Sequence, residues 1–207
     1  MRGDANAAAL QALLAPSSAG EPRIAPARPR ELGLLARVVA VVTARATGTG
    51  PPNIFMTLAR HPRLFRAWLR YSAHLMPFGT LPRRDTELVI LRVAWRCGSA
   101  YEWRQHVPLA LRAGLRADEI AGVAGEPYGF ASRRQALLAA TDELLADRAL
   151  TDATWRAVRD ALGEREAIEL FLLVGHYQGL ATALGGLRIQ VEKSAAPAGP
   201  ASAQTLR

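Results

Sequence analysis

Three residues with acid–base side chains lie near one another in the middle of the chain: Glu87, Glu102 and His106. Glu102 and His106 are four residues apart, so on a helix they share one face, with their Cβ atoms ~5–6 Å apart. A carboxylate beside an imidazole favours the charged imidazolium, whereas partial burial disfavours it. Such a pair can titrate near neutral pH, where a general acid or base is most effective. The spacing predicts a proton-transfer site at His106, oriented by Glu102.

Glu87 belongs to this site only if the chain turns back on itself. On one straight helix Glu87 and His106 would be ~28 Å apart at ~1.5 Å per residue. Gly98-Ser99 supplies a break, and a helical hairpin folded there would return His106 toward Glu87. Two interpretations stay open on spacing alone: an inward-facing site carboxylate, or a capping-turn glutamate after Pro82.

The elements that must position these residues are predicted to be helices. Apolar residues recur at helical spacing through most of the body, and strand-like alternation never lasts more than a few residues. The pattern therefore predicts an all-α fold with a central helical hairpin. The expected helices cover residues 34–46, 53–60, 63–76, 82–97, a helix that starts near Ser99 or Tyr101 and ends at Gly114, 117–124, a segment that begins at Ser132, another that begins at Thr151, and 164–184.

Composition divides the chain of 207 residues into three parts. Residues 1–31 contain Pro22, Pro26 and Pro29 and no sustained period, which predicts a flexible N-terminal arm. Residues 32–193 form the predicted single helical domain. Residues 194–207, rich in alanine, proline and serine, predict a disordered C-terminal tail.

Charge and hydropathy exclude several classes of protein. The longest apolar runs stay below the ~18–20 residues of a membrane span, and the N-terminus does not resemble a signal peptide, so we expect a cytoplasmic protein without membrane contact. The net charge is +8, but the arginines are scattered rather than clustered into a stripe. We therefore expect no nucleic-acid partner.

Cys97 is the only cysteine, so a disulfide within the chain and a thiol-rich metal site are both excluded. Glu87, Glu102 and His106 could supply three metal ligands, but the paired Glu-x-x-His motifs of carboxylate-bridged iron sites are absent. We expect neither a metal nor an organic cofactor.

Further side chains are expected at the edge of the site. Tyr101 and Trp103 flank Glu102, and the indole of Trp103 is suited to exclude water. Ser99 lies at the expected turn. His176, on the most apolar helix, is interpreted as a buried histidine bonded to a backbone or hydroxyl group, and as the next candidate for the pocket.

Four motifs carry a family resemblance: Glu87-Leu-Val-Ile-Leu-Arg-Val-Ala, Tyr101-Glu-Trp-Arg-Gln-His106, Ala110-Leu-Arg-Ala-Gly-Leu115 and Val174-Gly-His-Tyr177. Together they resemble the carboxymuconolactone decarboxylase family, which includes the alkylhydroperoxidase D-like proteins. The resemblance covers roughly residues 50–190, and its specific part lies within about 85–120. It implies an alkylhydroperoxidase D-like helical bundle that assembles into a homo-oligomer, a trimer or a hexamer.

The chain departs from the peroxidase-type members of that family, which carry a glutamate, a Cys-x-x-Cys pair and a histidine. The glutamate and histidine fall on Glu87 and His106, but the two cysteine positions fall on Ser99 and Glu102. Neither residue forms a disulfide, so a dithiol mechanism is disfavoured. Cys97 could be oxidised alone but would need an external thiol, and we interpret it as a buried, inert cysteine.

The resemblance then implies acid–base chemistry on a small carboxylated or lactone substrate, as in the decarboxylase branch. His106 would move the proton, Glu102 would orient it and Glu87 would complete the relay, with Arg92 or Arg104 as a candidate for holding a substrate carboxylate. Two alternatives stay open: a peroxidase-related oxidoreductase with peroxiredoxin-like activity through Cys97, and a non-catalytic member of the fold.

Overall fold

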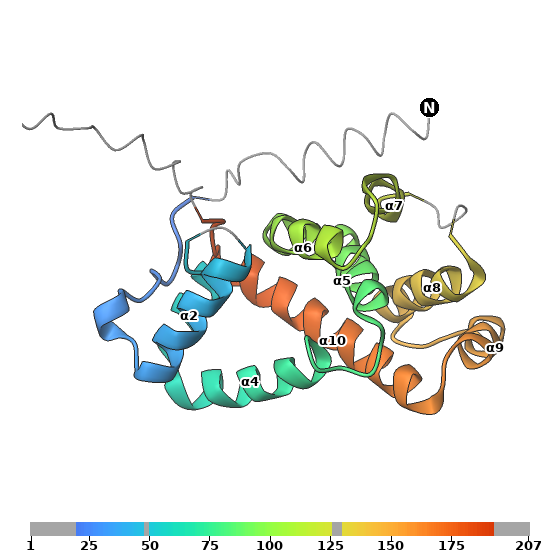
Figure 1. Cartoon of the computed structure of the whole chain (residues 1–207), viewed down its shortest axis with the longest axis horizontal. Helices are drawn as coiled ribbons and strands as arrows, with labels where there is room; N and C mark the ends of the chain where they lie inside the picture. The colour runs from blue at the N-terminus through green and yellow to red at the C-terminus, as the bar shows by residue number, and fades with distance from the viewer. Residues whose placement is uncertain (1–19, 48–49, 126–129, 193–207) are drawn as a thin grey trace, which may run out of the picture.

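The computed structural model describes residues 20–47, 50–125 and 130–192. Within these ranges the chain is helical and contains no strand, which confirms the predicted all-α class. Figure 1 shows the arrangement of the helices. The elements are η1 (Pro29–Glu31), α2 (Leu34–Thr47), α3 (Asn53–Leu58), α4 (Pro62–Leu75), α5 (Arg83–Arg96), α6 (Ala100–Arg112), α7 (Ala117–Val123), α8 (Ser132–Asp147), α9 (Asp152–Ala161) and α10 (Glu164–Leu187).

Helix α5 is the centre of the fold. Every side chain from Asp85 to Ala94 is buried, because α6, α8 and α10 all pack against it. A helix buried on all sides has an apolar sequence without a polar face, and residues 88–91 show this pattern as Leu-Val-Ile-Leu. Any carboxylate on α5 is therefore placed in the interior and needs a partner there.

The predicted hairpin lies where it was expected, at Gly98-Ser99. Cys97 ends α5, and Gly98 adopts a φ of 62°, a left-handed conformation that glycine adopts without steric cost. The Ser99 amide then donates to the Ala94 carbonyl at 2.8 Å, and α6 starts at the next residue. The turn directs α6 back along α5, so that residues far apart in the sequence face each other.

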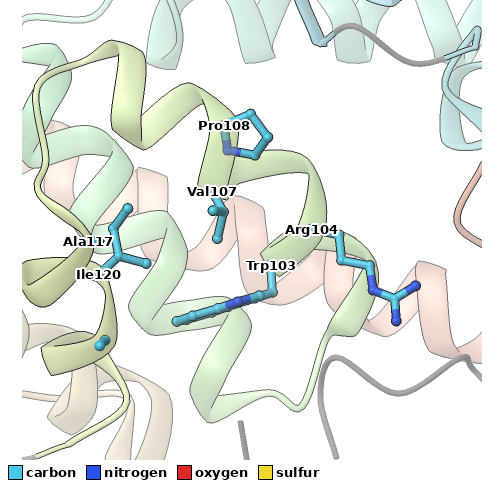
Figure 2. A pocket seen from close by; sticks show the side chains of 7 residues that line it. Trp103, Arg104, Val107, Pro108, Ala117 and Ile120 are labelled. Carbon is cyan, nitrogen blue, oxygen red and sulfur yellow. The ribbon is translucent and has the colours of Figure 1, made fainter. Parts of the chain in front are cut away.

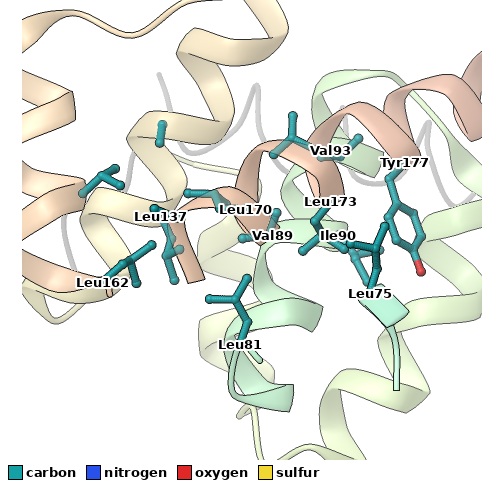
Figure 3. Close-up of a cluster of buried hydrophobic side chains, with 14 residues drawn as sticks. Leu75, Leu81, Val89, Ile90, Val93, Leu137, Leu162, Leu170, Leu173 and Tyr177 are labelled. Atoms are coloured by element: carbon teal, nitrogen blue, oxygen red, sulfur yellow. The ribbon is translucent and has the colours of Figure 1, made fainter. Parts of the chain in front are cut away.

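Helix α10 crosses the molecule along its length (Figure 1) and supplies one side of the main core. Leu170 and Leu173 pack with Val89 and Ile90 of α5, and Tyr177 lies at one end of this cluster (Figure 3). By length and composition α10 could also span a membrane, and 28% of its most apolar window is buried. Core helices pass the same test, so this property carries little weight.

The turn between α4 and α5 is fixed by a buried glutamate of α10. The Glu169 carboxylate accepts hydrogen bonds from the Thr80 amide at 2.5 Å and the Leu81 amide at 3.2 Å. Gly79 is required here, because a Cβ atom at this position would overlap the Glu169 carboxylate and lie 2.6 Å from the Leu75 carbonyl oxygen. The start of α5, and with it the site below, is therefore anchored to α10.

The described part of the predicted N-terminal arm packs on the helical body. Ala27 is buried with Leu32 in a cluster that includes Phe65, and its amide donates to the Met56 carbonyl at 3.1 Å. At the other end, Glu192 accepts a hydrogen bond from the Tyr101 hydroxyl at 2.5 Å. The arm's residues 1–19 and the predicted tail, 194–207, lie outside the described residues.

Candidate functional site

The hairpin brings Glu87 and His106 into direct contact. Glu87 is fully buried on α5, and its Oε2 atom lies 2.8 Å from Nδ1 of His106 on α6. A hydrogen bond donated from Nδ1 to this oxygen leaves the second ring nitrogen, Nε2, for exchange with a bound molecule. Of the two interpretations of Glu87, the structure supports the inward-facing carboxylate.

A second contact holds the other oxygen of the same carboxylate. The Arg83 guanidinium, one turn earlier on α5, lies 2.6 Å from Glu87 Oε1. Its NH1 nitrogen is buried and makes no hydrogen bond to the described part of the chain. Arg83 was not among the residues predicted for the site; the signal for it was the i, i+4 spacing to Glu87.

Glu102 does not orient His106, although the two lie four residues apart on α6. Both of its carboxylate oxygens are buried and without a hydrogen-bond partner among the described residues, as is the nearby Ser99 hydroxyl. Burial raises the pKa of Glu102 from 4.5 to about 8, and Ser99 only partly offsets this. At neutral pH Glu102 is therefore a neutral carboxylic acid, which changes its expected role from acceptor to donor.

Helix α10 adds Tyr177, which was not among the residues predicted for the site. Its ring meets the His106 ring edge-on, with centroids 5.2 Å apart, and its hydroxyl donates to Met76 Sδ at 3.5 Å. Burial, followed by the carboxylates of Glu87 and Glu102, raises the pKa of this phenol well above 10. The only signal in the sequence was its place in the Val174–Tyr177 motif.

His176 lies beside this centre and not within it. Its Nε2 atom is 3.1 Å from the Ser72 hydroxyl, which agrees with the predicted hydroxyl partner, and its ring stacks on Trp68. Burial lowers the pKa of His176 to about 4, so the ring is neutral at physiological pH. This histidine links α4 to α10, and its contact with the site passes through Tyr177, 5.3 Å away.

The expectation of a buried Cys97 is wrong: the residue is exposed. It ends α5 at the outer side of the hairpin turn, where the helix leaves the core. Partial burial of the thiol and the negative charge of Glu102 raise the pKa of Cys97, while Arg96 lowers it. The thiolate fraction at neutral pH is therefore small, although the sulfur is accessible.

Tyr101 and Trp103 lie on other faces of α6. The Tyr101 hydroxyl accepts from the Ile54 amide at 3.2 Å and donates to Glu192, so this side chain ties together three segments. Trp103 packs on Trp95 and lines a shallow apolar pocket of about 330 Å³ between α6 and α7 (Figure 2). The pocket's other lining residues are Arg104, Val107, Pro108, Ala117, Ile120 and Ala121.

Arg92 is not available to a substrate. Its guanidinium pairs with both carboxylate oxygens of Asp142, at 2.8 and 2.5 Å, and also donates to the carbonyls of Val123 and Gly125. These bonds connect α5 to α7 and α8, so Arg92 stabilises the packing of these helices. The arginine that contacts the Glu87 carboxylate is Arg83. In the described ranges, no three His, Cys, Asp or Glu side chains are grouped to hold a metal ion.

This geometry sits in the part of the chain that matches a known family. Residues 62–143, from α4 into α8, match the Carboxymuconolactone decarboxylase family. The match contains the whole hairpin with Glu87, Glu102 and His106. The motifs quoted from the sequence predicted a resemblance to this family, and the match over residues 62–143 confirms it; the sequence lacks the Cys-x-x-Cys pair.

Solved structures share the fold. An alkylhydroperoxidase AhpD core, an uncharacterized peroxidase-related protein from Ralstonia eutropha JMP134, matches with a TM-score of 0.74 at 18% identity, covering 83% of this chain and 93% of that one. The debrominase Bmp8 in complex with 2,3,4-tribromopyrrole matches with a TM-score of 0.73 at 14% identity, covering 84% and 94%. Identities this low show the fold alone. No curated protein matches the sequence.

Proposed function

We propose that this chain is an enzyme that performs acid–base chemistry, decarboxylation or a related lyase or isomerase reaction, on a small carboxylated or lactone substrate. The observation that carries the proposal is the buried Glu87–His106 contact, at 2.8 Å, beside a neutral Glu102. A base held in one tautomer next to an acid with a raised pKa is the arrangement that proton transfer near neutral pH requires.

The reaction balances without an oxidant or a reductant. The bond between the substrate carboxylate and the carbon that carries it breaks, carbon dioxide leaves, and the electron pair passes into an adjacent carbonyl to form an enolate. In this step His106 acts as the imidazolium: it gives its Nε2 proton to the enolate carbon, and one proton taken up from solvent restores it. Glu87 would hold Nδ1 throughout. Arg83, whose NH1 has no hydrogen-bond partner among the described residues, would bind the substrate carboxylate.

A second candidate function uses the thiol of Cys97, and the exposure of that residue is the observation in its favour. A peroxide would oxidise the thiolate to a sulfenic acid, which an external thiol would then have to reduce. The raised pKa of Cys97 opposes this route, because the thiolate is the reactive form.

Turnover on a panel of small β-keto acids and carboxylated lactones, followed by release of carbon dioxide, tests the proposal. We expect His106→Ala to lower kcat by about 10²–10⁴-fold, the usual contribution of a general acid or base, and Cys97→Ser to leave it unchanged. Full activity in His106→Ala would sink the acid–base proposal. Loss of activity in Cys97→Ser would instead support the thiol route.

The proposal includes a cytoplasmic homo-oligomer, a trimer or a hexamer. Two exposed apolar surfaces support assembly: Leu34, Val38 and Val42 on α2, and Ile168 and Leu172 on α10. Large exposed apolar side chains in groups are typical of protein interfaces. Light scattering of the purified chain at micromolar concentration tests this, and a monomer would contradict it.

A further inference from the structure

Two strong hydrogen-bond donors in the site have no adequate acceptor. The Tyr177 hydroxyl donates only to the thioether of Met76, at 3.5 Å, and sulfur of this type is a weak acceptor. Glu102 is 2% exposed, and within the described residues neither carboxylate oxygen has a hydrogen-bond partner. Buried polar groups are normally paired, so two such groups in one place indicate a partner that binds there.

The two groups converge from different helices. Glu102 and His106 share a face of α6, and the Tyr177 ring of α10 meets the His106 ring at 5.2 Å. The phenol is close enough to Glu102 for that carboxylate to raise its pKa, after burial and Glu87. The histidine that is proposed to move the proton thus has Glu102 on its own helix face and Tyr177 in ring contact from α10.

Both donors are neutral at physiological pH. Burial raises the pKa of Glu102 to about 8 and contributes most to raising that of Tyr177 well above 10, so each keeps its proton. The charged or titratable groups near them are Arg83 and Glu87 from α5, Cys97 at the end of α5, His106 from α6 and His176 from α10. A phenol and a protonated carboxyl group in an apolar site are an established pair of donors to an enolate oxygen in enzymes.

We propose that Tyr177 and Glu102 form an oxyanion site that donates two hydrogen bonds to the enolate oxygen of the substrate. The substrate class is then narrower than a carboxylated molecule in general. It is a carbonyl compound whose carbonyl oxygen gains negative charge during the reaction, with the reacting carbon turned toward His106. This inference rests on the proposed function, because it names the groups that stabilise the negative charge formed on the carbonyl oxygen by decarboxylation or deprotonation.

These donors can favour the reaction because the substrate oxygen becomes more negative as the reaction proceeds. Hydrogen bonds from fixed donors strengthen as a carbonyl oxygen becomes an enolate oxygen, so they stabilise the transition state more than the bound substrate. Above the pKa of Glu102 the carboxyl group becomes an anion and repels the same oxygen. Affinity for an oxyanion should therefore fall above pH about 8.

A phenolate that absorbs visible light tests the site without turnover. We use 4-nitrophenol, which resembles an enolate in its charged oxygen and planar ring, and follow the absorbance of bound nitrophenolate. The wild-type chain is expected to bind the anion more tightly than the neutral phenol. Tyr177→Phe and Glu102→Ala should each weaken binding of the anion about tenfold, the usual effect of one hydrogen bond to a charged group. Circular dichroism of each variant checks that the fold is retained.

The matched control is Tyr71→Phe, which removes an exposed phenol on α4 whose ring contacts His176. It should bind nitrophenolate as the wild type does. In Glu102→Gln, which cannot ionise, the loss of affinity above pH 8 should disappear. Absence of binding to the wild type, or unchanged affinity in folded Tyr177→Phe, overturns the oxyanion site. Neither result depends on turnover, so the outcome is separate from the His106→Ala test of the proposed function.

Discussion

The Nδ1 atom of His106 lies 2.8 Å from the Oε2 atom of Glu87, and this contact joins the two helices of the hairpin inside the core. The histidine side chain is 9% exposed and the glutamate side chain is fully buried. A charged group in such a place is stable only with a partner, so each residue depends on the other.

Removal of Glu87 should therefore destabilise the fold. Glu87→Ala leaves His106 and Arg83 without their acceptor and opens a cavity beside α5, for which we expect a loss of about 2–4 kcal/mol in the free energy of unfolding. Urea unfolding measures this loss. A double-mutant cycle with His106→Ala should give a coupling of about 1–3 kcal/mol, and strict additivity would contradict the contact. Asp118→Asn, in an exposed pair with Arg116, is the control and should show no measurable change.

Glu102 should make the protein less stable as the pH rises. Its pKa is 4.5 when unfolded and about 8 when folded, because burial favours the neutral form. Between these values the folded chain holds a proton that the unfolded chain has lost, so the free energy of unfolding falls with increasing pH. His176, whose pKa drops from 6.5 to about 4 on burial, acts in the opposite direction and only below pH 6.5. The net decrease should therefore appear between pH 6.5 and 8.

The size of that decrease is about 2 kcal/mol, from about 1.36 kcal/mol for each pH unit of a one-proton difference. Chemical unfolding at a series of pH values measures it. Glu102→Gln should flatten the profile in this window, whereas Glu143→Gln, whose carboxylate has a lowered pKa, should not. A wild-type profile that is flat from pH 6.5 to 8 would show that Glu102 is ionised in the folded state.

Gly79 should not tolerate a side chain. In Gly79→Ala the new Cβ meets the Glu169 carboxylate and the Leu75 carbonyl, so the turn that starts α5 must shift and the hydrogen bonds to Thr80 and Leu81 are strained. We expect a loss of about 1–3 kcal/mol, as for other overpacked sites, measured by thermal unfolding. Gly175→Ala on α10 is the matched control, since its Cβ meets nothing within 4 Å and alanine favours the helix. Equal stability of the two variants would argue against the close approach.

The thiol of Cys97 should react slowly at neutral pH. Its pKa is raised by partial burial and by Glu102, so alkylation by iodoacetamide should accelerate only as the pH exceeds the ordinary range of a cysteine. Mass spectrometry of the alkylated chain gives the rate at each pH. In Glu102→Gln the negative charge is absent and the midpoint of the rate profile should move to lower pH. A midpoint near neutral pH in the wild type would support a reaction mechanism that uses the Cys97 thiolate.

Local patterns in the sequence predicted most of the architecture. The break at Gly98-Ser99 and the apolar run after Glu87 predicted a hairpin with a buried first helix, and both are present. These features depend on backbone conformation and on periodicity, which neighbouring residues determine. The same local reasoning paired Glu102 with His106, because residues four apart share a face of a helix.

Packing between helices sets which of those residues make contact and which of them stay protonated. Glu87 rather than Glu102 bonds His106, because α6 packs against α5, and spacing along one helix does not predict that contact. Tyr177 reaches the site only because α10 packs across α5. Burial then raises the pKa of Glu102 to about 8, and burial is a property of all the surrounding helices together. Local sequence specifies which acid–base groups are present and the helices that carry them, whereas packing sets which of them donate and which accept.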